Sequence, residues 1–465
     1  MPNTWGDPPR VTQQTRYTPR VNRPIRAMTP LLALALTACA SLDPSHERAQ
    51  LAQTVQDRTG ILPDEWLRAT AANDLPTQLS PDEAARIALT HNPRLHASLH
   101  RIAAARADLV QAGLLPNPVL SVDLGFHIGG PEGSTQIGTS LVAQLASLLS
   151  RADRQSAADQ ALRAEVLAAS DLALSTVAAA RAAHARVLFA QAALAPAQDA
   201  VAMAEKAVNT TRQRAQAGEE STLEVNRQRL LLARLTSELA QRQTDLELRK
   251  RELLTRLGLA DHAPDLTAIE TDATGAPAHD SATDLATETD AIAAARTNRL
   301  DVAAARALAD SATATIAAQR KSRFDFGAGA GFERTDDKRR ELGPSISASI
   351  PIFDTGDARV ARAQADAQRL ALEAAQTEQS AIAEARAAWI TARSAHDLAR
   401  RYETDVTPLS ETNLTLAQHS FSAGQADLTV LLETQQASVE AKLKLTELKE
   451  RAALAEIELR RAVGR

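Results

Sequence analysis

Aromatic residues and cysteine are scarce in this 465-residue chain. Phenylalanine, tyrosine and tryptophan together make up 3% of the residues, and there is one cysteine. The cores of globular domains take much of their buried area from aromatic rings, so a row of ordinary globular domains is not expected here. A single cysteine also excludes an internal disulfide, and stability therefore has to come from packing and assembly.

A strong charge of one sign and long apolar runs are also lacking. The formal net charge is −5 and the pI is near 6.1. No basic stripe interleaved with aromatic residues occurs, which argues against nucleic acid as a partner. Beyond the N-terminal region no run approaches 18 apolar residues, so the sequence predicts no transmembrane helix, and a membrane crossing would need β-strands.

The short motifs of common enzyme and metal sites are missing as well. There is no Gly-x-Ser-x-Gly nucleophile turn, no phosphate-binding P-loop and no His-Glu-x-x-His motif. His96 and His100 lie four residues apart, with His91 nearby, but no third ligand follows at a fixed spacing. We interpret them as solvated side chains and expect no catalytic residue, no cofactor and no metal site.

Alanine is abundant where aromatic residues are scarce, as in the run Ala178-Ala179-Ala180. Alanine has the highest helix propensity, and its small side chain lets helices approach closely. The sequence therefore predicts a mainly α-helical fold built from long, tightly packed helices.

The N-terminus carries a secretion signal. Residues 28–39 read MTPLLALALTAC and follow three arginines, an order typical of a signal peptide. The last four residues of this run resemble the bacterial lipobox, so we predict a signal peptide at 1–38 and a lipidated, palmitate-bearing Cys39 that opens an N-terminal segment at 39–78. Ala40 and Ser41 carry no acidic retention signal, which indicates the outer membrane. Met1 and Met28 both remain candidate start residues.

The rest of the chain contains an internal two-fold repeat. Gly218 and Gly424 stand in similar segments and are 206 residues apart (424 − 218). The same spacing recurs between Asn92 and Asn298, between Phe126 and Phe332, and between Gly258 and Gly464. Landmarks at one fixed spacing indicate a duplicated unit. We assign 79–258 to the first repeat, 259–286 to a linker or equatorial segment and 287–465 to the second repeat.

Each repeat is expected to begin with a helix and two strands. The helices are predicted over 80–111, which opens with a Ser-Pro-Asp-Glu start signal, and over about 287–320. The strands are predicted at about 119–127 and 135–145, and again at about 324–332 and 342–352. Strands of roughly nine to eleven residues suit a tilted crossing of a bilayer, although a hairpin outside the membrane remains an alternative.

A long helical hairpin is expected to complete each repeat. Its first arm covers 151–217 or 357–423, with breaks predicted at Pro196 and Pro408. The chain then reverses at Gly218 or Gly424, since glycine suits the turn after a helix. The first returning arm has leucines at coiled-coil spacing, namely Leu232, Leu235, Leu239, Leu246, Leu253 and Leu257.

Several short motifs resemble one family, the TolC-type outer-membrane efflux factors. They are Leu79-Ser80 with Glu83-Ala84, Asn92-Pro93, Leu115-Pro116-Asn117-Pro118, Pro351-Ile352-Phe353-Asp354 and the two glycine turns. The resemblance covers about residues 79–465. It implies four transmembrane strands per chain, a twelve-stranded barrel in a homotrimer and a periplasmic α-barrel of coiled-coil helices. Leu300, where the family prefers proline, and Val430, where an acidic residue is common, depart from it.

The resemblance implies the outer-membrane channel of a tripartite efflux pump. Its partners would be two further copies of the chain, a periplasmic adaptor (membrane fusion) protein, an inner-membrane pump of the RND or ABC type, and outer-membrane lipid. Residues 343–356, GPSISASIPIFDTG, resemble members that serve heavy-metal or cation pumps. A type I protein secretion duct and a periplasmic coiled-coil lipoprotein without a pore are the alternatives.

A tunnel that ends in the periplasm needs a gate near the hairpin turns at Gly218 and Gly424. Acidic residues just beyond them would form a ring of like charges in a trimer, which attracts cations. The candidates are Glu224, Asp427 and Glu433. Glu433 is favoured because it lies nine residues after its glycine, where members of the resembled family often carry a gating carboxylate. For Glu224 a solvated position outside the tunnel is an equal alternative.

Overall fold

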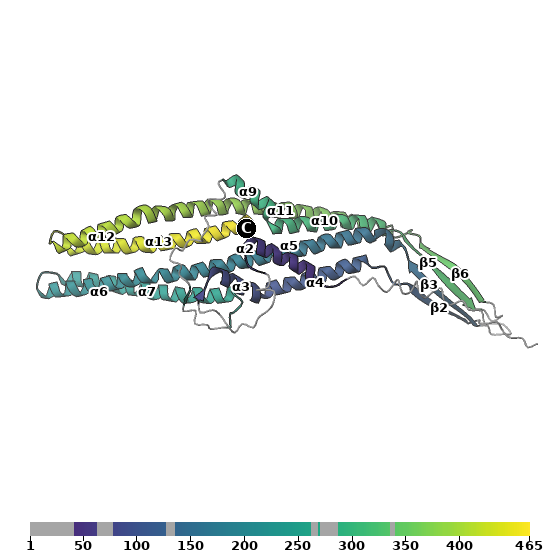
Figure 1. Ribbon diagram of the computed structural model, residues 1–465, viewed down its shortest axis with the longest axis horizontal. Coiled ribbons are helices and arrows are strands. Elements are labelled where there is room, and N and C mark those ends of the chain that lie inside the picture. The colour runs from purple at the N-terminus through teal and green to yellow at the C-terminus, as the bar shows by residue number, and fades with distance from the viewer. Residues whose placement is uncertain (1–40, 63–77, 127–134, 262–267, 270–286, 335–339) are drawn as a thin grey trace, which may run out of the picture. The chain divides into compact units, whose positions relative to one another are not determined.

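Helices form most of the structure, and one four-stranded sheet accompanies them (Figure 1). The computed structural model describes residues 41–62, 78–126, 135–261, 268–269, 287–334 and 340–465. The described part of the first half contains α2 (Ser45–Thr59), β1 (Gln78–Leu79), α3 (Pro81–His91), α4 (Pro93–Gly113), β2 (Val119–Phe126), β3 (Thr135–Gln144), α5 (Ala146–Ala192), α6 (Leu194–Gln216) and α7 (Thr222–Arg256).

The second half follows the same order of elements. It contains β4 (Ala268–Ile269), α9 (Glu288–Asn298), α10 (Leu300–Lys321), β5 (Asp325–Arg334), β6 (Arg340–Ser349), α11 (Asp357–Arg401), a π-helical turn (Tyr402–Val406), α12 (Thr407–Ser422) and α13 (Leu428–Ala462). Short parallel strands β1 and β4 pair with each other. The predicted mainly helical architecture with a small sheet is confirmed.

Alanine side chains build much of the helix packing. On α11 the buried residues include one alanine every seven positions, from Ala367 through Ala374, Ala381 and Ala388 to Ala395. This spacing keeps one narrow face of a long helix against its neighbours, α10 and α13. Because the contact side chains are single methyl groups, the helices approach closely, as the composition predicts.

Helix α5 lies at the centre of the helical part. It packs against α2, α3, α4, α7, α10 and α13. Together with α6 it forms the one described stretch, Ala146–Gln216, that is long and apolar enough to cross a membrane by length and composition. The expectation that no such stretch exists was wrong. The many alanines of this helix raise its mean hydropathy, although polar residues interrupt every apolar run. Its many helix contacts are those of a core helix.

The helix predicted over 80–111 is two helices. Asn92 ends α3 and begins α4, because its side chain accepts a hydrogen bond from the Arg94 amide at 2.9 Å and Pro93 occupies the first position of α4. The second half has the same corner between α9 and α10 although Leu300 stands where proline was expected. There Arg299 has an extended backbone (φ −69°, ψ 124°), as a residue between two helices requires.

The long arms also break close to the predicted prolines. Helix α5 ends at Ala192, four residues before Pro196 (196 − 192), and α6 begins at Leu194. In the second half the π-helical turn precedes Pro408, which lies in the first turn of α12. Proline cannot donate a helical hydrogen bond, so the preceding turn loosens and the helix bends.

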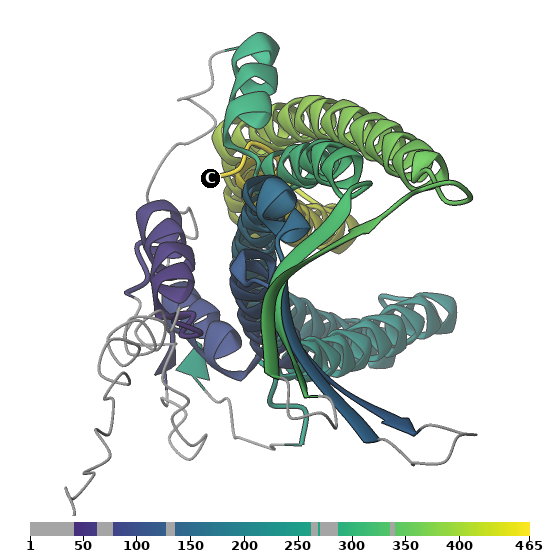
Figure 2. The same ribbon diagram turned by 90° about the vertical axis from the view of Figure 1, so that its right-hand side faces the viewer.

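The four-stranded sheet has the order β2-β3-β5-β6, with all neighbours antiparallel. Strand β6 runs from Arg340 to Ser349, so it begins two residues earlier and ends three residues earlier than the predicted strand 342–352. His127, the predicted last residue of the first strand, lies outside the described residues. Figure 2 shows the strands as one twisted, curved layer that continues from the helices. In residues 42–465, the strands lie at one end and the α6–α7 and α12–α13 turns at the other (Figure 1).

Candidate functional site

The register gives the sheet two chemically different faces. Residues directly opposite in neighbouring strands point to the same face, so Leu120 and Leu141 share one face, and Ser121 and Ser140 share the other. The apolar face carries Leu120, Val122, Leu124, Ile137, Leu141, Phe326, Phe332, Leu342 and Ile346. The polar face carries Ser121, Asp123, Gln136, Ser140, Gln144, Asp325, Glu333, Ser345, Ser347 and Ser349.

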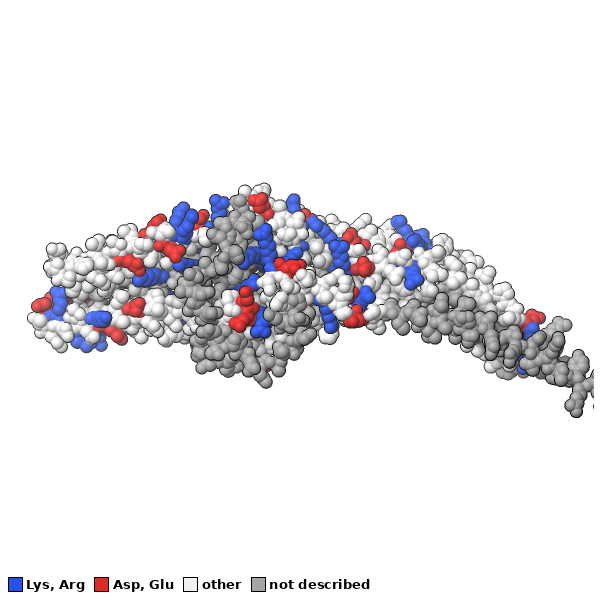
Figure 3. Space-filling model, viewed as in Figure 1, with Lys and Arg blue, Asp and Glu red and all other residues white. Residues whose placement is uncertain are grey.

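The apolar face is not covered by the chain itself. Ile346 is 85% exposed, Leu342 79% and Leu120 66%. In the space-filling view the visible surface over the strands is largely uncharged, while basic and acidic side chains are interspersed over the helices (Figure 3). A continuous apolar face of this kind is typical of a surface that meets lipid or another protein.

The polar face is lined by small residues where the strands approach most closely. A β-carbon on Gly327 would lie 2.9 Å from the Ser347 hydroxyl oxygen and 3.0 Å from the Ala143 carbonyl oxygen. Only glycine leaves room for this approach. The small and hydroxylated side chains keep this side of the curved sheet polar and unobstructed.

Both outer strands of the sheet have a free edge in the described part of the chain. Strand β2 pairs only with β3, and β6 pairs only with β5. Pro344 stands within β6, opposite Ala330, and proline within a strand is confined largely to edges because it has no N–H to donate. A free edge leaves a row of unpaired backbone groups that can pair with another strand.

The two helical hairpins turn at the predicted glycines. Gly218 (φ 79°) and Gly424 (φ 71°) have the left-handed conformation that follows a helix. In each turn the next residue's amide returns to the helix: Glu219 donates to the Arg214 carbonyl at 2.9 Å, and Gln425 to the Ser420 carbonyl at 2.8 Å. The sequence thus placed both turns correctly.

The three gate candidates differ in their surroundings. The Glu224 carboxylate accepts hydrogen bonds from Arg227 (3.1 Å) and Gln228 (2.8 Å), so its charge is compensated within α7. Asp427 and Glu433 are exposed, and neither carboxylate has a hydrogen bond or ion pair within the described ranges. Glu433 lies beside a groove between α12 and α13, next to Leu416 and Val430. The second hairpin therefore carries the uncompensated acidic groups.

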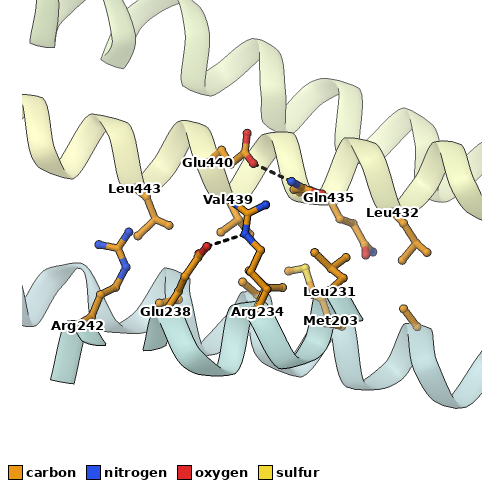
Figure 4. Close-up of a pocket in the computed structure, with 16 residues that line it drawn as sticks. Met203, Leu231, Arg234, Glu238, Arg242, Leu432, Gln435, Val439, Glu440 and Leu443 are labelled. Atoms are coloured by element: carbon orange, nitrogen blue, oxygen red, sulfur yellow. Dashed lines mark hydrogen bonds and ion pairs between the residues drawn. The ribbon is translucent and has the colours of Figure 1, made fainter. Parts of the chain in front are cut away.

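A small cavity separates the two hairpins. Its volume is about 80 Å³, and it lies where α6 presents alanines to α7 and α13. Figure 4 shows Met203, Leu231, Leu432 and Val439 around it, with the Arg234–Glu238 ion pair at its rim. Closer to the centre of the helical part, Arg249 joins the hairpins through an ion pair with Glu450 at 2.5 Å. The hairpins are thus joined by an ion pair near the centre of the helical part, and the cavity lies between this pair and the turns.

A buried charged cluster at the α9–α10 corner was not foreseen from the sequence. The Arg299 side chain is 8% exposed and forms hydrogen bonds to Asp301 (2.9 and 2.6 Å) and to Glu384 of α11 (2.6 Å). The hydrogen bonds that Arg299 donates to Asp301 raise the pKa of Arg299 above its usual value. The sequence signal for this cluster is an arginine between two helices, and it does not indicate which carboxylates Arg299 will bind.

His184 of α5 is another buried polar residue that sequence reasoning missed. It is 2% exposed, and its Nε2 lies 2.7 Å from the Leu79 carbonyl oxygen. Burial lowers the pKa of this imidazole, although the bond to Leu79 opposes the shift. The neutral ring that donates through Nε2 therefore joins α5 to β1.

The histidines considered for metal binding do not converge. His96 Nε2 lies 2.7 Å from the Thr90 carbonyl oxygen, and His91 Nδ1 lies 3.1 Å from the Ile87 carbonyl oxygen. In the part of the chain that the structure describes, no three His, Cys, Asp or Glu residues gather as a metal-binding group. Cys39, the predicted lipidation residue, lies outside the described residues.

Comparison with known proteins identifies the second half of the chain. Residues 291–465 match the family described as outer membrane efflux protein. The chain carries an outer membrane efflux protein domain. The resemblance to the TolC-type outer-membrane efflux factors is thereby confirmed, and the protein is assigned to the outer membrane. No curated protein matches the chain.

Solved structures of channel and outer-membrane proteins share the fold. The channel OprN is 19% identical, with 84% of this chain and 90% of that chain covered and a TM-score of 0.67. CusC is 18% identical (83% and 92% covered, TM-score 0.65). VceC of Vibrio cholerae is 17% identical (83% and 96% covered, TM-score 0.64). The covered share of this chain is larger than residues 291–465, so the shared fold extends over the first half as well.

Proposed function

We propose that this chain is the outer-membrane channel component of a tripartite efflux pump, a passive trimeric duct without enzymatic activity. The observation that carries the proposal is the sheet with one apolar face, one polar face and two free edges. Open sheet edges do not occur in lipid, because each unpaired backbone group costs several kcal/mol there. Three copies would supply twelve strands and close the edges in a barrel, with the polar faces toward the lumen.

The helical part supports the same assembly. Helix α7 packs on α6, α6 on α13 and α13 on α12, so α7 and α12 flank the four-helix layer. Each flanking helix exposes two leucines seven residues apart: Leu223 (70% exposed) and Leu230 (73%) on α7, and Leu409 (61%) and Leu416 (59%) on α12. Leucines at this spacing pack against a partner helix. The α7 edge of one copy would meet the α12 edge of the next.

The gate is proposed at the α12–α13 turn. Residues 402–441 contain no lysine or arginine but include Glu403, Asp405, Glu411, Asp427, Glu433 and Glu440. Three copies of this hairpin around one axis would give a strongly acidic mouth that attracts cations. Glu433 is the principal gate residue in this proposal, with Asp427 nearer the turn, while the compensated Glu224 contributes less.

The remaining assignments concern the anchor, the domains and the partners. We propose a leader at 1–38, a lipid anchor on Cys39, and duplicated units at 79–258 and 287–465 around an equatorial segment. Equivalent contacts in the two units support the duplication. The glycine after the last long helix of each unit packs against the end of that unit's first helix, Gly258 against His91 and Gly464 against Asn298. The periplasmic partners are an adaptor protein and an RND-type or ABC-type pump.

The proposed cargo is metal cations or other small molecules. The acidic hairpin favours cations. A type I secretion duct is the alternative cargo class. Deletion of the protein should raise sensitivity to divalent metals under the main proposal. Unchanged metal tolerance with loss of an exported protein would favour the secretion duct.

Purified full-length protein in detergent gives the direct test of the pore. Native mass spectrometry should show three chains, and the same sample should form ion-conducting channels in a planar bilayer. Replacing both Leu223→Asp and Leu230→Asp should shift the mass to single chains, whereas Arg101→Met on α4 should leave the trimer intact. A monomeric wild type without conductance would instead support the coiled-coil lipoprotein.

The anchor is tested separately. Mass spectrometry of the mature N-terminus should find an acylated Cys39. An unmodified cysteine within an uncleaved chain would contradict lipidation and leave the channel proposal standing, because the strands alone would hold the protein in the membrane.

A further inference from the structure

Arg58 near the end of α2 joins the first described helix to the last residues of the chain. Its Nη1 donates to the Asn298 carbonyl oxygen and to the Gly464 carbonyl oxygen, both at 2.7 Å. These acceptors lie 240 and 406 residues farther along the sequence. One guanidinium therefore connects three segments that are distant in sequence.

One acceptor lies at a helix end, and the other lies in the turn just after one. Asn298 is the last residue of α9, and Gly464 follows the end of α13. The last carbonyls of a helix have no intrahelical donor and carry partial negative charge, so a cation that donates hydrogen bonds stabilises them. Arg58 thus caps α9 and binds the turn that follows α13.

The capped segments also touch each other. A β-carbon on Gly464 would lie 2.8 Å from the Asn298 carbonyl carbon and 3.0 Å from the Arg299 nitrogen. The backbone of the C-terminal turn therefore rests directly on the α9–α10 corner. Any displacement of this turn would separate the two carbonyl groups that Arg58 bridges.

Helix α2 is firmly docked where it presents Arg58. Leu51, Ala52 and Val55 are at most 1% exposed and belong to a core shared with α3, α4 and α5. Arg181 of α5 donates to the Thr59 carbonyl oxygen at 3.3 Å and so caps α2 in turn. The apolar contacts hold α2 to the first half, which leaves Arg58 as its bridge to the second half.

We propose that α2 is a strap that fastens the carboxyl end of the chain. In this arrangement Arg58 holds the C-terminal turn against the α9–α10 corner, and the ends of α9 and α13 remain ordered only while the strap is docked. The role belongs to the folded protomer and does not depend on pore formation.

Hydrogen exchange of the full-length protein in detergent tests the strap. Arg58→Met keeps most of the side-chain volume and removes both hydrogen bonds. The matched control is Arg101→Met, which removes an exposed ion pair with Glu165 on a neighbouring helix. Peptides covering 288–300 and 459–465 should exchange at least about tenfold faster in Arg58→Met, since two charged hydrogen bonds are lost. They should exchange at the wild-type rate in Arg101→Met.

The expected increase is local. Peptides from the hairpin turns, 212–226 and 418–431, should be unchanged in both variants. If Arg58→Met does not accumulate, Arg58→Gln, which is neutral and shorter, should show the same local pattern. Equal exchange at 459–465 in the Arg58 and Arg101 variants would overturn the proposal. So would an increase confined to α2, or one spread evenly over all helices.

Discussion

Gly329 of β5 lies so close to Leu141 of β3 that a β-carbon on it would come within 2.1 Å of the Leu141 carbonyl oxygen. Gly331, two residues farther along the same face, would place its β-carbon 3.9 Å from the Thr139 carbonyl oxygen, an ordinary contact. The two positions have the same residue type, strand and face but opposite tolerance for a side chain.

Gly329→Ala should therefore strain the sheet by about 1–3 kcal/mol, because a backbone oxygen cannot move aside without disturbing the ladder. Gly331→Ala should be nearly neutral. The temperature at which the purified assembly loses its β-sheet circular dichroism measures the effect. Equal melting of the two variants would contradict the close approach of β3 and β5.

His184 predicts a loss of stability on the acid side. Burial lowers its pKa in the folded protein, whereas an unfolded chain protonates histidine near pH 6.5. The folded state then binds fewer protons than the unfolded state as the pH falls below about 6.5, so stability decreases toward the lowered pKa of the folded protein. Above that range His184 contributes no pH dependence.

His184→Gln should flatten this part of the profile, with a smaller drop in melting temperature between pH 7.5 and 5.5 than in wild type. His100→Gln on the exposed side of α4 is the control and should follow the wild-type curve. A His184→Gln profile that overlays the wild type would show that this ring does not titrate between the two states.

The Arg299 cluster predicts a large difference between Arg299, at the start of α10, and Arg306 within that helix. Arg299→Met leaves Asp301 and Glu384 without their buried partner and should cost on the order of 3 kcal/mol. Arg306→Met removes an ion pair with Glu378 in which Arg306 is 51% exposed, and should cost less than about 1 kcal/mol. Denaturant unfolding monitored by helical circular dichroism compares them, and equal losses would argue against a structural role for the cluster.

The acidic hairpin predicts a change of ion selectivity. In single-channel recordings Glu433→Gln should reduce both cation selectivity and block by multivalent cations, because three negative charges leave the proposed mouth. Glu224→Gln should have a smaller effect, since Arg227 and Gln228 already bind that carboxylate. If conductance, selectivity and block in Glu433→Gln all match wild type, Glu433 does not line the mouth.

The sequence predicts best those features that depend on neighbouring residues. The alanine-rich segments are long helices, and Gly218 and Gly424 form the hairpin turns, because helix propensity and left-handed glycine act locally. The helix predicted across Asn92-Pro93 was wrong for a local reason as well. Asparagine before proline is a helix cap followed by the first residue of the next helix, so Asn92 ends one helix and begins another.

Contacts between segments that are distant in the sequence could not be predicted from it. Nothing near Arg58 indicates Asn298 or Gly464 as its acceptors, and nothing near Arg299 indicates Glu384. The two faces of the sheet likewise needed the register, because glycine and serine in β5 and β6 hide the alternation within those two strands. These contacts are set by how the two halves of the chain meet.

The bridge made by Arg58 also has a consequence in time. The chain is made from its N-terminus, so Arg58 is made before its acceptors, and Gly464 follows it 406 residues later. At roughly 5–20 residues per second, that interval is about 20–80 s. During this interval the Gly464 carbonyl group has not yet been made. The hydrogen bond between Arg58 and Gly464 therefore cannot form until then. A chain that stops before Gly464 would never make this contact, so the paired state of Arg58 depends on synthesis having passed Gly464.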